Sequence, residues 1–228
     1  MNYYGQCKKR GEAIMSTTKK VIWLAGVLFL AGMQSPARSI TANEIIAKVQ
    51  SKYDDIENIF AKFTQSIRYK VSKIEQENTG TIYFKKKNKY RIESEQQVVV
   101  TDGVTSWAYN AKNKQVIINK YKEDAKSLSP EKLLFSYPKD YYSSYIGEEK
   151  VLKEEMYVLK LTPKEDNTST GSIKVWINHD WLIKQVEVVD MNKTITRYTM
   201  KELKIDKGIP DTQFQFSVPA GVDVVDLR

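Results

Sequence analysis

Side chains that could perform acid–base, nucleophilic or metal chemistry are scarce in this sequence of 228 residues. It contains one histidine, His179 in the stretch INHDWL, and one cysteine, Cys7. A catalytic triad needs a base beside its nucleophile, and a transition-metal site needs several imidazole or thiolate ligands. His179 lies between two predicted strands and is better interpreted as a turn residue. These residues predict no enzyme, although a serine nucleophile with a lysine base stays open.

Phosphate and nucleic-acid chemistry are equally poorly supported. The sequence has no glycine-rich loop of the type that cradles phosphate groups. The stretch YFKKKNKY, residues 83–90, combines lysines with aromatic residues, but its neighbours predict a strand end and a lysine-rich turn. The net charge of +8 comes from 36 Lys and Arg against 28 Asp and Glu residues. This mixture indicates a solvated surface, so we expect neither a cofactor nor a nucleic-acid partner.

Apolar and aromatic side chains are the stronger functional signal. In VVVTDGVTSWAYN, residues 98–110, the pair Asp102-Gly103 predicts a hairpin turn, because glycine accepts a positive φ. The alternation that follows places Trp107 and Tyr109 on one face of a strand. We expect this face to line a concave apolar surface, which is either filled as a core or encloses a hydrophobic ligand.

An amphipathic helix is predicted before the strands begin. Thr41 is followed three residues later by Glu44, which is the spacing of a capping box. Apolar residues then recur at helical spacing, namely Ile45, Ile46, Val49, Tyr53 and Ile56. The apolar stripe is expected to pack against a large apolar surface. An ordinary core and a ligand-facing role are equally compatible with it.

From Asn58 the apolar period changes from that of a helix to two. Ile59, Ala61 and Phe63 share one parity, whereas the polar residues from Lys62 to Arg68 share the other. Ile82 and Phe84 share one face of the next strand. About ten strands at short spacing predict one mainly β (α+β) domain over residues 38–228. Its architecture would be a single antiparallel sheet that is strongly curved or forms an open barrel.

Residues 127–149 interrupt the strand pattern. Ser129 is a candidate N-cap and Pro130 suits the first helical position. Apolar and aromatic residues follow, including Leu133, Leu134 and Phe135. We predict one or two short helices that cross one face of the sheet as a packed lid. The alternative is a solvent-exposed connection with a local hydrophobic anchor.

The N-terminal residues predict export. Two lysines precede the apolar run at residues 21–32, and small residues lie just before Arg38, as in a secretory signal peptide. The run is shorter than the roughly 20 residues of a membrane-spanning helix. Met15 is a more natural start than Met1, so residues 1–14 are interpreted as translated upstream sequence. We expect residues 1–37 to be removed, with an uncleaved anchor as the alternative.

The order of these motifs resembles the LolA family of periplasmic carriers of outer-membrane lipoproteins, from about Ile40 to Asp226. The resemblance begins with Phe63-Thr64-Gln65 after the first helix and continues with the basic turn in GTIYFKKKNKYRIE. It includes the Asp102-Gly103 hairpin with Trp107 and Tyr109. Later motifs are LKLTPK, IKVWINHDWLIKQVEVVD and FQFSVPAGVDVVD. Each motif is loose alone, but their order and number are specific.

This resemblance implies an unclosed antiparallel β-barrel in which short helices cover a hydrophobic cavity as a lid. It implies a monomeric carrier without enzymatic activity, located in the periplasm. The cargo would be the acyl chains of lipoproteins, received from an inner-membrane ABC transporter complex and passed to an outer-membrane receptor where the cell has one. The residues expected to contact lipid are Phe63, Ile82, Phe84, Trp107, Tyr109, Leu133, Leu134 and Phe135.

One position departs from the family pattern. Known members have an arginine-proline pair before the Asn of the basic turn, and that arginine reaches the lid. Lys86 and Lys87 occupy these positions here. Lysine lacks the planar fork with which arginine holds several carbonyl groups. We therefore expect Lys86 to be a weaker lid contact, with Arg91 as a candidate substitute, or the cargo to differ.

Two other classes of function remain as alternatives. The first is a binder or sensor of other envelope lipids, or a regulator of an envelope stress pathway. The second is an envelope hydrolase, which the missing catalytic residues make the weakest of the three.

Overall fold

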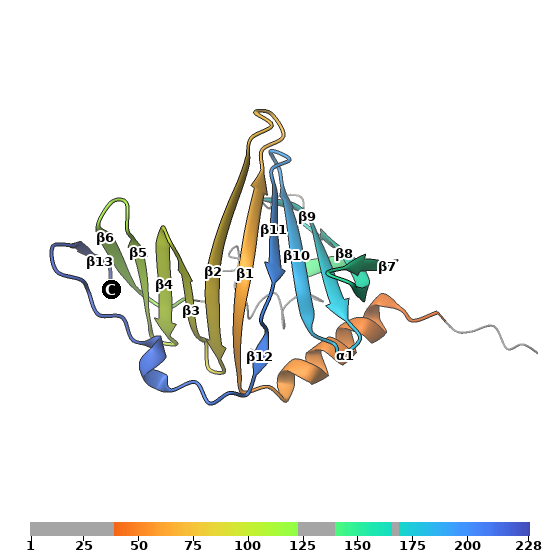
Figure 1. The fold of residues 1–228 in the computed structure, drawn as a ribbon, viewed down its shortest axis with the longest axis horizontal. Coiled ribbons are helices and arrows are strands. Elements are labelled where there is room, and N and C mark those ends of the chain that lie inside the picture. Colours follow the sequence, from red (N-terminus) through yellow and green to blue (C-terminus); the bar gives the residue numbers. More distant parts are fainter. Residues whose placement is uncertain (1–38, 123–139, 166–168) are drawn as a thin grey trace, which may run out of the picture. The chain divides into compact units, whose positions relative to one another are not determined.

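The computed structural model describes residues 39–122, 140–165 and 169–228. In these ranges, the α-helix α1 (Ala42–Asp54) precedes a series of strands that join one large sheet (Figure 1). The strands are β1 (Asn58–Arg68), β2 (Glu75–Lys85), β3 (Lys89–Ser94), β4 (Gln97–Asp102), β5 (Thr105–Asn110), β6 (Gln115–Lys120), β7 (Tyr141–Val151), β8 (Glu154–Pro163), β9 (Thr170–Asn178), β10 (Ile183–Asp190), β11 (Ile195–Met200), β12 (Lys204–Ile205) and β13 (Asp223–Asp226). Within the described ranges, no helix has both the length and the apolar character needed to cross a membrane.

The strands follow one path through the sheet, in the order β13-β6-β5-β4-β3-β2-β1-β11-β10-β9-β8-β7. Neighbours are antiparallel except β13, which runs parallel to β6, and the short β12 lies beside part of β1. The path ends at β13 on one side and at β7 on the other, so the curved sheet stays open. This confirms the predicted single sheet in an unclosed barrel, and the parallel pair of β13 and β6 departs from the predicted antiparallel pairing.

Helix α1 begins with the predicted capping box. The Thr41 hydroxyl accepts the Glu44 N–H at 3.2 Å, and the Glu44 carboxylate accepts the Thr41 N–H at 2.9 Å. These bonds satisfy N–H groups that have no partner within the helix. The apolar stripe is confirmed as well, because Ile45, Val49 and Tyr53 are buried.

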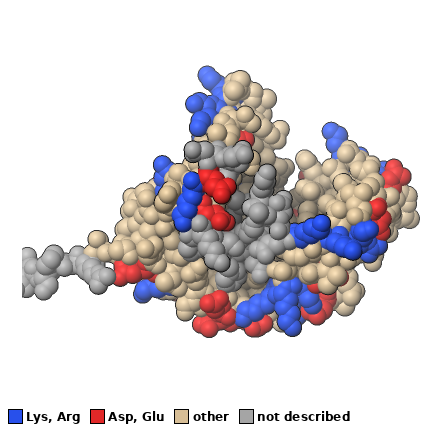
Figure 2. Space-filling model, turned by 180° about the vertical axis from the view of Figure 1, so that it is seen from behind, with Lys and Arg blue, Asp and Glu red and all other residues tan. Residues whose placement is uncertain are grey.

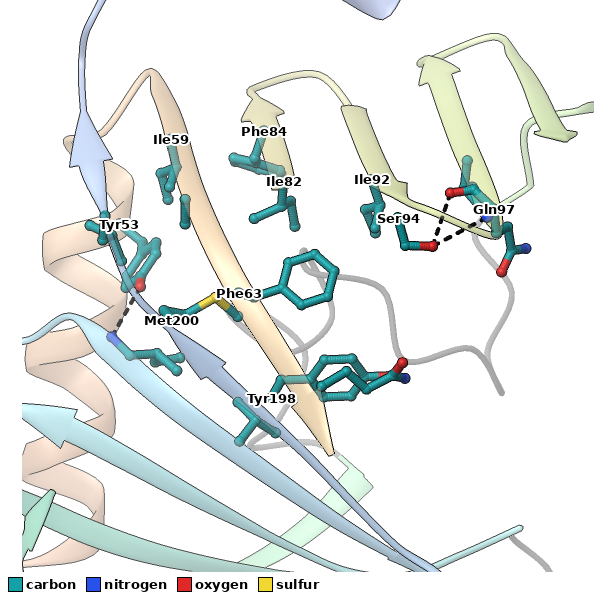
Figure 3. Close-up of a pocket in the computed structure, with 16 residues that line it drawn as sticks. Tyr53, Ile59, Phe63, Ile82, Phe84, Ile92, Ser94, Gln97, Tyr198 and Met200 are labelled. Carbon is teal, nitrogen blue, oxygen red and sulfur yellow. Dashed lines mark hydrogen bonds between the residues drawn. The ribbon is translucent and has the colours of Figure 1, made fainter. Parts of the chain in front are cut away.

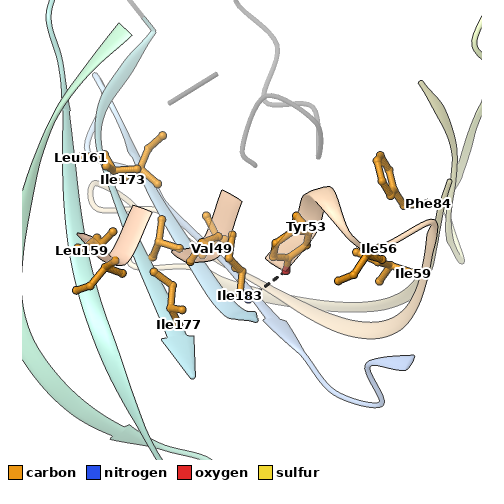
Figure 4. Close-up of a cluster of buried hydrophobic side chains, with 13 residues drawn as sticks. Val49, Tyr53, Ile56, Ile59, Phe84, Leu159, Leu161, Ile173, Ile177 and Ile183 are labelled. Atoms are coloured by element: carbon orange, nitrogen blue, oxygen red, sulfur yellow. Dashed lines mark hydrogen bonds between the residues drawn. The ribbon is translucent and has the colours of Figure 1, made fainter. Parts of the chain in front are cut away.

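The stripe of α1 packs on one part of the concave face of the sheet. Figure 4 shows its side chains against those of β8, β9 and β10, and next to the start of β1. The buried partners on the sheet are Ile59, Phe84, Leu159, Leu161, Ile173, Val175, Ile177, Ile183 and Val186. Removing this much apolar surface from water is the main stabilising term for the helix, since an isolated helix of 13 residues is marginal in water.

The last turn of α1 is fixed by a buried polar contact. The Tyr53 hydroxyl accepts the backbone N–H of Ile183 at 3.1 Å, at the start of β10 (Figure 4). Burial raises the pKa of Tyr53 to about 12, although the hydrogen bond from Ile183 acts in the opposite direction. The phenol therefore stays neutral, and it joins the end of the helix to the sheet.

The opposite face of β3, β4 and β5 is covered by the C-terminal segment, which contains the 3-10 helix η2 (Asp211–Phe214). Phe214 is fully buried. Lys85 and Lys89 both donate to the Asp211 carboxylate, at 2.6 and 2.8 Å, and these bonds lower the pKa of Asp211 to about 2. Arg91 donates to the Gln215 carbonyl at 3.2 Å. The basic turn thus holds the C-terminal segment in place.

One predicted element is wrong in part. Residues 141–149, predicted as part of a helical lid, belong to the edge strand β7. The side chains of Tyr141 and Tyr145 pack against the core, while Tyr142 is exposed, which is the alternation of a strand. The tyrosines suit either element, and pairing with β8 decides between them. The remainder of the predicted lid, including Leu133, Leu134 and Phe135, lies outside the described residues.

Replacing Tyr53 by Phe should lower the free energy of unfolding by about 1–3 kcal/mol, because the Ile183 N–H then loses its acceptor in a buried place. Urea unfolding monitored by circular dichroism measures this change. The matched control is Tyr142→Phe, which removes a hydroxyl from a side chain that is 65% exposed and should have little effect.

The same pair of variants tests the pKa of Tyr53. In the unfolded chain this phenol loses its proton near pH 10, whereas in the folded protein it does so near 12. Its contribution to stability is therefore complete below pH 10 and is lost as the pH rises toward 12. Unfolding free energies between these pH values should fall more steeply for the wild type and Tyr142→Phe than for Tyr53→Phe. Equal slopes would contradict the buried phenol.

Candidate functional site

A pocket of about 360 Å³ lies on the part of the concave face that α1 leaves uncovered. Strands β1, β2, β3 and β4 form one wall and strands β10 and β11 continue it, with Tyr53 at the helix end (Figure 3). The described lining residues include no Asp, Glu, Lys, Arg, His or Cys. Most of them are aliphatic or aromatic, so the pocket suits an apolar ligand.

Strand register explains why these side chains meet. Across the sheet, Ala61 of β1 lies opposite Ile82 of β2, which lies opposite Ile92 of β3, which lies opposite Val99 of β4. Paired residues point to the same face, so these four form a row along the pocket wall. The neighbouring rows contain Ile59 and Phe84 on one side and Phe63 on the other, as Figure 3 shows.

Phe63 occupies the middle of the pocket because Gly80 makes room for its ring. The two residues are paired across β1 and β2. A Cβ atom on Gly80 would lie 2.6 Å from the Phe63 Cζ and 2.3 Å from the Glu93 carbonyl oxygen. Neither distance is acceptable for a real carbon atom, so only glycine allows the ring to lie over the strand.

The end of the pocket nearest the β1–β2 hairpin is polar. The Gln65 amide donates to the Tyr198 hydroxyl at 2.9 Å. Ser94 and Gln97 exchange hydrogen bonds of 3.2 Å between the serine hydroxyl and the glutamine backbone, drawn in Figure 3. The opposite end, near the last turn of α1, is lined by Tyr53, Ile59, Phe84, Ile183 and Leu203. The pocket therefore has an apolar end and an end that offers hydrogen-bonding groups.

The geometry offers no acid–base or metal chemistry at this place. Tyr53, with its pKa raised to about 12, is a poor proton donor at neutral pH. In the described part of the chain, no three or more His, Cys, Asp and Glu side chains are grouped as a metal ion requires. His179 is exposed in the turn after β9 and its ring stacks on Tyr157, with the centroids 4.8 Å apart. The uncharged, mostly apolar lining is suited to binding an apolar ligand.

Three of the residues predicted to contact lipid, Phe63, Ile82 and Phe84, do line the pocket. The predicted placement of Trp107 and Tyr109 on the concave face is wrong. They pair with Val100 and Val98, which point to the opposite face from Val99.

The outer face explains why these two aromatic residues are directed away from the pocket. The Tyr109 ring lies 6.0 Å from that of Phe216 in the C-terminal segment. The period of two showed that Trp107 and Tyr109 share a face. It contained no information on which face of the sheet is concave, nor on the segment that covers the other one.

The two predicted lid contacts have other described partners. The Lys86 ammonium group donates to the Asp54 carbonyl and to the Glu57 carboxylate, both at 2.8 Å, and the bond to Glu57 raises the pKa of Lys86. Lys86 thus holds the C-terminal end of α1, where a cation is favourable. Arg91 pairs with Val100 on the outer face and donates to the Glu93 carboxylate and the Gln215 carbonyl. Its proposed role as a substitute lid contact stays a prediction.

Several lining residues were not predicted from the sequence. Gln65 shares its parity with Phe63, and Ile92 with Ser94, so these could have been found from strand alternation alone. Tyr198 and Met200 could not, because β11 meets β1 only through a pairing between distant segments. No local pattern in the sequence specifies that register.

Residues 54–217 match the family model described as "Outer membrane lipoprotein carrier protein LolA". A protein of Histophilus somni (strain 2336) is 26% identical over 213 residues, which are 92% of this chain and 98% of that protein. A protein of Glaesserella parasuis serovar 5 (strain SH0165) is 27% identical over 188 residues, or 81% and 87% of the two chains. Both are named outer-membrane lipoprotein carrier protein.

Solved structures share the fold at lower identity. An uncharacterized conserved protein from Thermus thermophilus superposes with a TM-score of 0.55 at 14% identity, covering 81% of this chain and 98% of that one. MucB superposes with a TM-score of 0.50 at 16% identity, covering 81% and 65%. These likenesses support the open sheet with its helix.

Replacing Gly80 by Ala should lower the free energy of unfolding by about 1–3 kcal/mol, because the added carbon collides with backbone and displaces the Phe63 ring. Urea unfolding measures the loss. The control is Gly171→Ala in β9, whose Cβ would lie 3.2 Å from its nearest neighbour, the Val189 carbonyl oxygen, and which should cost less. Equal stability of the two variants would show that the Phe63 ring does not depend on Gly80.

Proposed function

The chain belongs to the LolA family of outer-membrane lipoprotein carrier proteins, whose model covers most of the described domain, and from this we propose that it carries lipoproteins by holding their acyl chains in the pocket. In this proposal residues 1–37 direct export of the chain to the periplasm and are removed in the course of it. It receives cargo from an inner-membrane ABC transporter complex and gives it to an outer-membrane receptor, where one exists. The lipoprotein's polypeptide stays outside the pocket.

The observation that carries the proposal is the uncharged lining of the pocket, described above. Acyl chains are held by burial, which is worth about 0.8 kcal/mol for each CH₂ group removed from water. A volume of about 360 Å³ falls at the lower end of the range of about 300–1,000 Å³ typical of small-molecule pockets. Burial of part of a lipid in such a pocket gives binding that is firm and still reversible, as a carrier requires.

The polarity of the two ends supports one orientation of the cargo. Hydrocarbon chains would lie toward Tyr53 and Phe84, where the lining is apolar. Ester and amide groups next to the chains need hydrogen-bond partners when they leave water. Gln65, Tyr198 and Ser94 supply such groups at the other end. We therefore place the lipid head at the hairpin end of the pocket.

A second candidate function is the binding or sensing of other envelope lipids. The described lining favours this candidate to the same degree, because it contacts a hydrocarbon chain and a polar head and has no charged group that would select a polypeptide. Mass spectrometry of what the purified protein retains from cells distinguishes the two functions. Recovery of lipoproteins supports the carrier, and recovery of free lipids alone supports the second candidate.

Replacing Ile82 by Asp should weaken the binding of a palmitoylated lipopeptide by about tenfold or more, because an unpaired charge in an apolar site costs several kcal/mol. Fluorescence titration with a labelled lipopeptide measures the affinity, and circular dichroism verifies the fold. The control is Thr81→Asp on the same strand, whose side chain points to the opposite face. Unchanged affinity of a folded Ile82→Asp variant would exclude this pocket as the site.

Replacing Tyr198 by Phe should weaken lipopeptide binding by about two- to tenfold, the value of roughly one hydrogen bond. The same variant should bind a purely hydrocarbon fluorescent probe as the wild type does, because the apolar end is untouched. Comparing the two ligands in one titration series separates these effects. Equal losses for both ligands would contradict the proposed orientation.

A further inference from the structure

Two hairpin tips lie side by side at one end of the sheet. The first tip, residues 69–74, joins β1 to β2, and the second, residues 190–194, joins β10 to β11. The pairing of Arg68 with Ile195 makes them neighbours, and Figure 1 shows both tips at the end of the sheet away from α1, with the first projecting furthest. We call these residues the tip surface.

Apolar side chains on the tip surface are held out in solvent. Val71 is 93% exposed, Met191 57% and Ile74 52%. The loops that present them are closed by hydrogen bonds. The Tyr69 N–H donates to the Ile74 carbonyl at 3.0 Å, and the Asp190 N–H donates to the Thr194 carbonyl at 3.0 Å. Isolated exposed apolar residues are common, but three on two adjoining, ordered turns call for a partner.

The same surface carries excess positive charge. Lys70, Lys73 and Lys193 lie within the two loops and are exposed. Asp190 is the single acidic residue of the two loops, and its carboxylate accepts the Thr194 N–H at 2.8 Å. Glu75, next to the first loop, pairs with Arg68. Figure 2 shows blue and tan atoms together on the uppermost projection.

We propose that the tip surface binds the surface of an anionic lipid bilayer. Val71, Ile74 and Met191 would enter the interface between head groups and acyl chains, and the lysines would lie at the level of the phosphates. Apolar residues flanked by lysines on a convex projection fit this partner, because membrane-surface binding combines apolar insertion with attraction to anionic lipid. A protein partner would need a recess of matching shape.

The position of the tip surface relative to the pocket agrees with this partner. Gln65, at the polar end of the pocket, lies three positions before Arg68 on β1, a distance of about 10 Å at the usual rise of a strand. The head of a bound lipid would thus lie on the side of the molecule that meets the membrane. The membrane contact itself does not depend on the proposed cargo.

The test is hydrogen exchange of the full chain with vesicles of phosphatidylethanolamine and phosphatidylglycerol. Anionic vesicles should slow exchange at residues 69–74 and 190–194 by about tenfold, the value of burying roughly one such side chain. The double variant Val71→Asp with Ile74→Asp should abolish this slowing. The double variant retains residues 1–38, so a loss of slowing in it cannot be assigned to binding through those residues.

The matched control is Val104→Asp, which alters a valine that is 73% exposed in the β4–β5 turn at the opposite end of the sheet. It should leave the slowing intact. No slowing at the tips, equal slowing with neutral phosphatidylcholine vesicles, or slowing that needs an added membrane protein would each overturn the proposal. Lipopeptide binding by Ile82→Asp is measured separately, so failure of the carrier function would leave this result unaffected.

Discussion

An open sheet with apolar side chains on both faces needs other segments of the chain to shield both faces from water. This structure depends on which segment covers which part of each face. Helix α1 covers the concave face over β8, β9 and β10. The C-terminal segment around Phe214 covers the outer face of β3 and β4. In the described part of the chain, the concave face over β1 to β4 receives neither, and the pocket lies there. Among the described residues, the pocket is thus the part of the concave face that neither α1 nor the C-terminal segment covers.

The boundary of that uncovered part is set by polar contacts at the end of α1. Apolar packing holds the body of the helix but is not directional. The Tyr53 hydroxyl on the Ile183 N–H and the Lys86 ammonium on the Asp54 carbonyl fix where the last turn lies. If the helix extended or shifted by a turn along the sheet, its side chains would fill the space beside Phe84. Two polar side chains therefore keep the pocket open at its apolar end.

The sequence correctly predicted those features that depend on residues close together in the chain. The Thr41–Glu44 capping box, the Asp102-Gly103 turn with Gly103 at φ 92°, and the shared face of Ile82 and Phe84 all depend on residues a few positions apart. The predictions were wrong for features that depend on segments far apart in the chain. The direction of Trp107 depends on which face the C-terminal segment covers, and the strand at Tyr141–Val151 depends on pairing with β8. Register and sheet curvature join segments that no local pattern connects.

In the proposed function, affinity and orientation would come from different residues of the pocket. The described lining is uncharged, so the free energy of binding would come from apolar burial, which accepts many chains and fixes none in direction. Direction can come only from the few polar groups, such as Gln65 and Tyr198 at the hairpin end. Each such hydrogen bond contributes about 1 kcal/mol, too little to select a cargo but enough to favour one orientation severalfold. Such a division would let the proposed carrier accept lipids that differ in their chains and still hold their heads at the hairpin end.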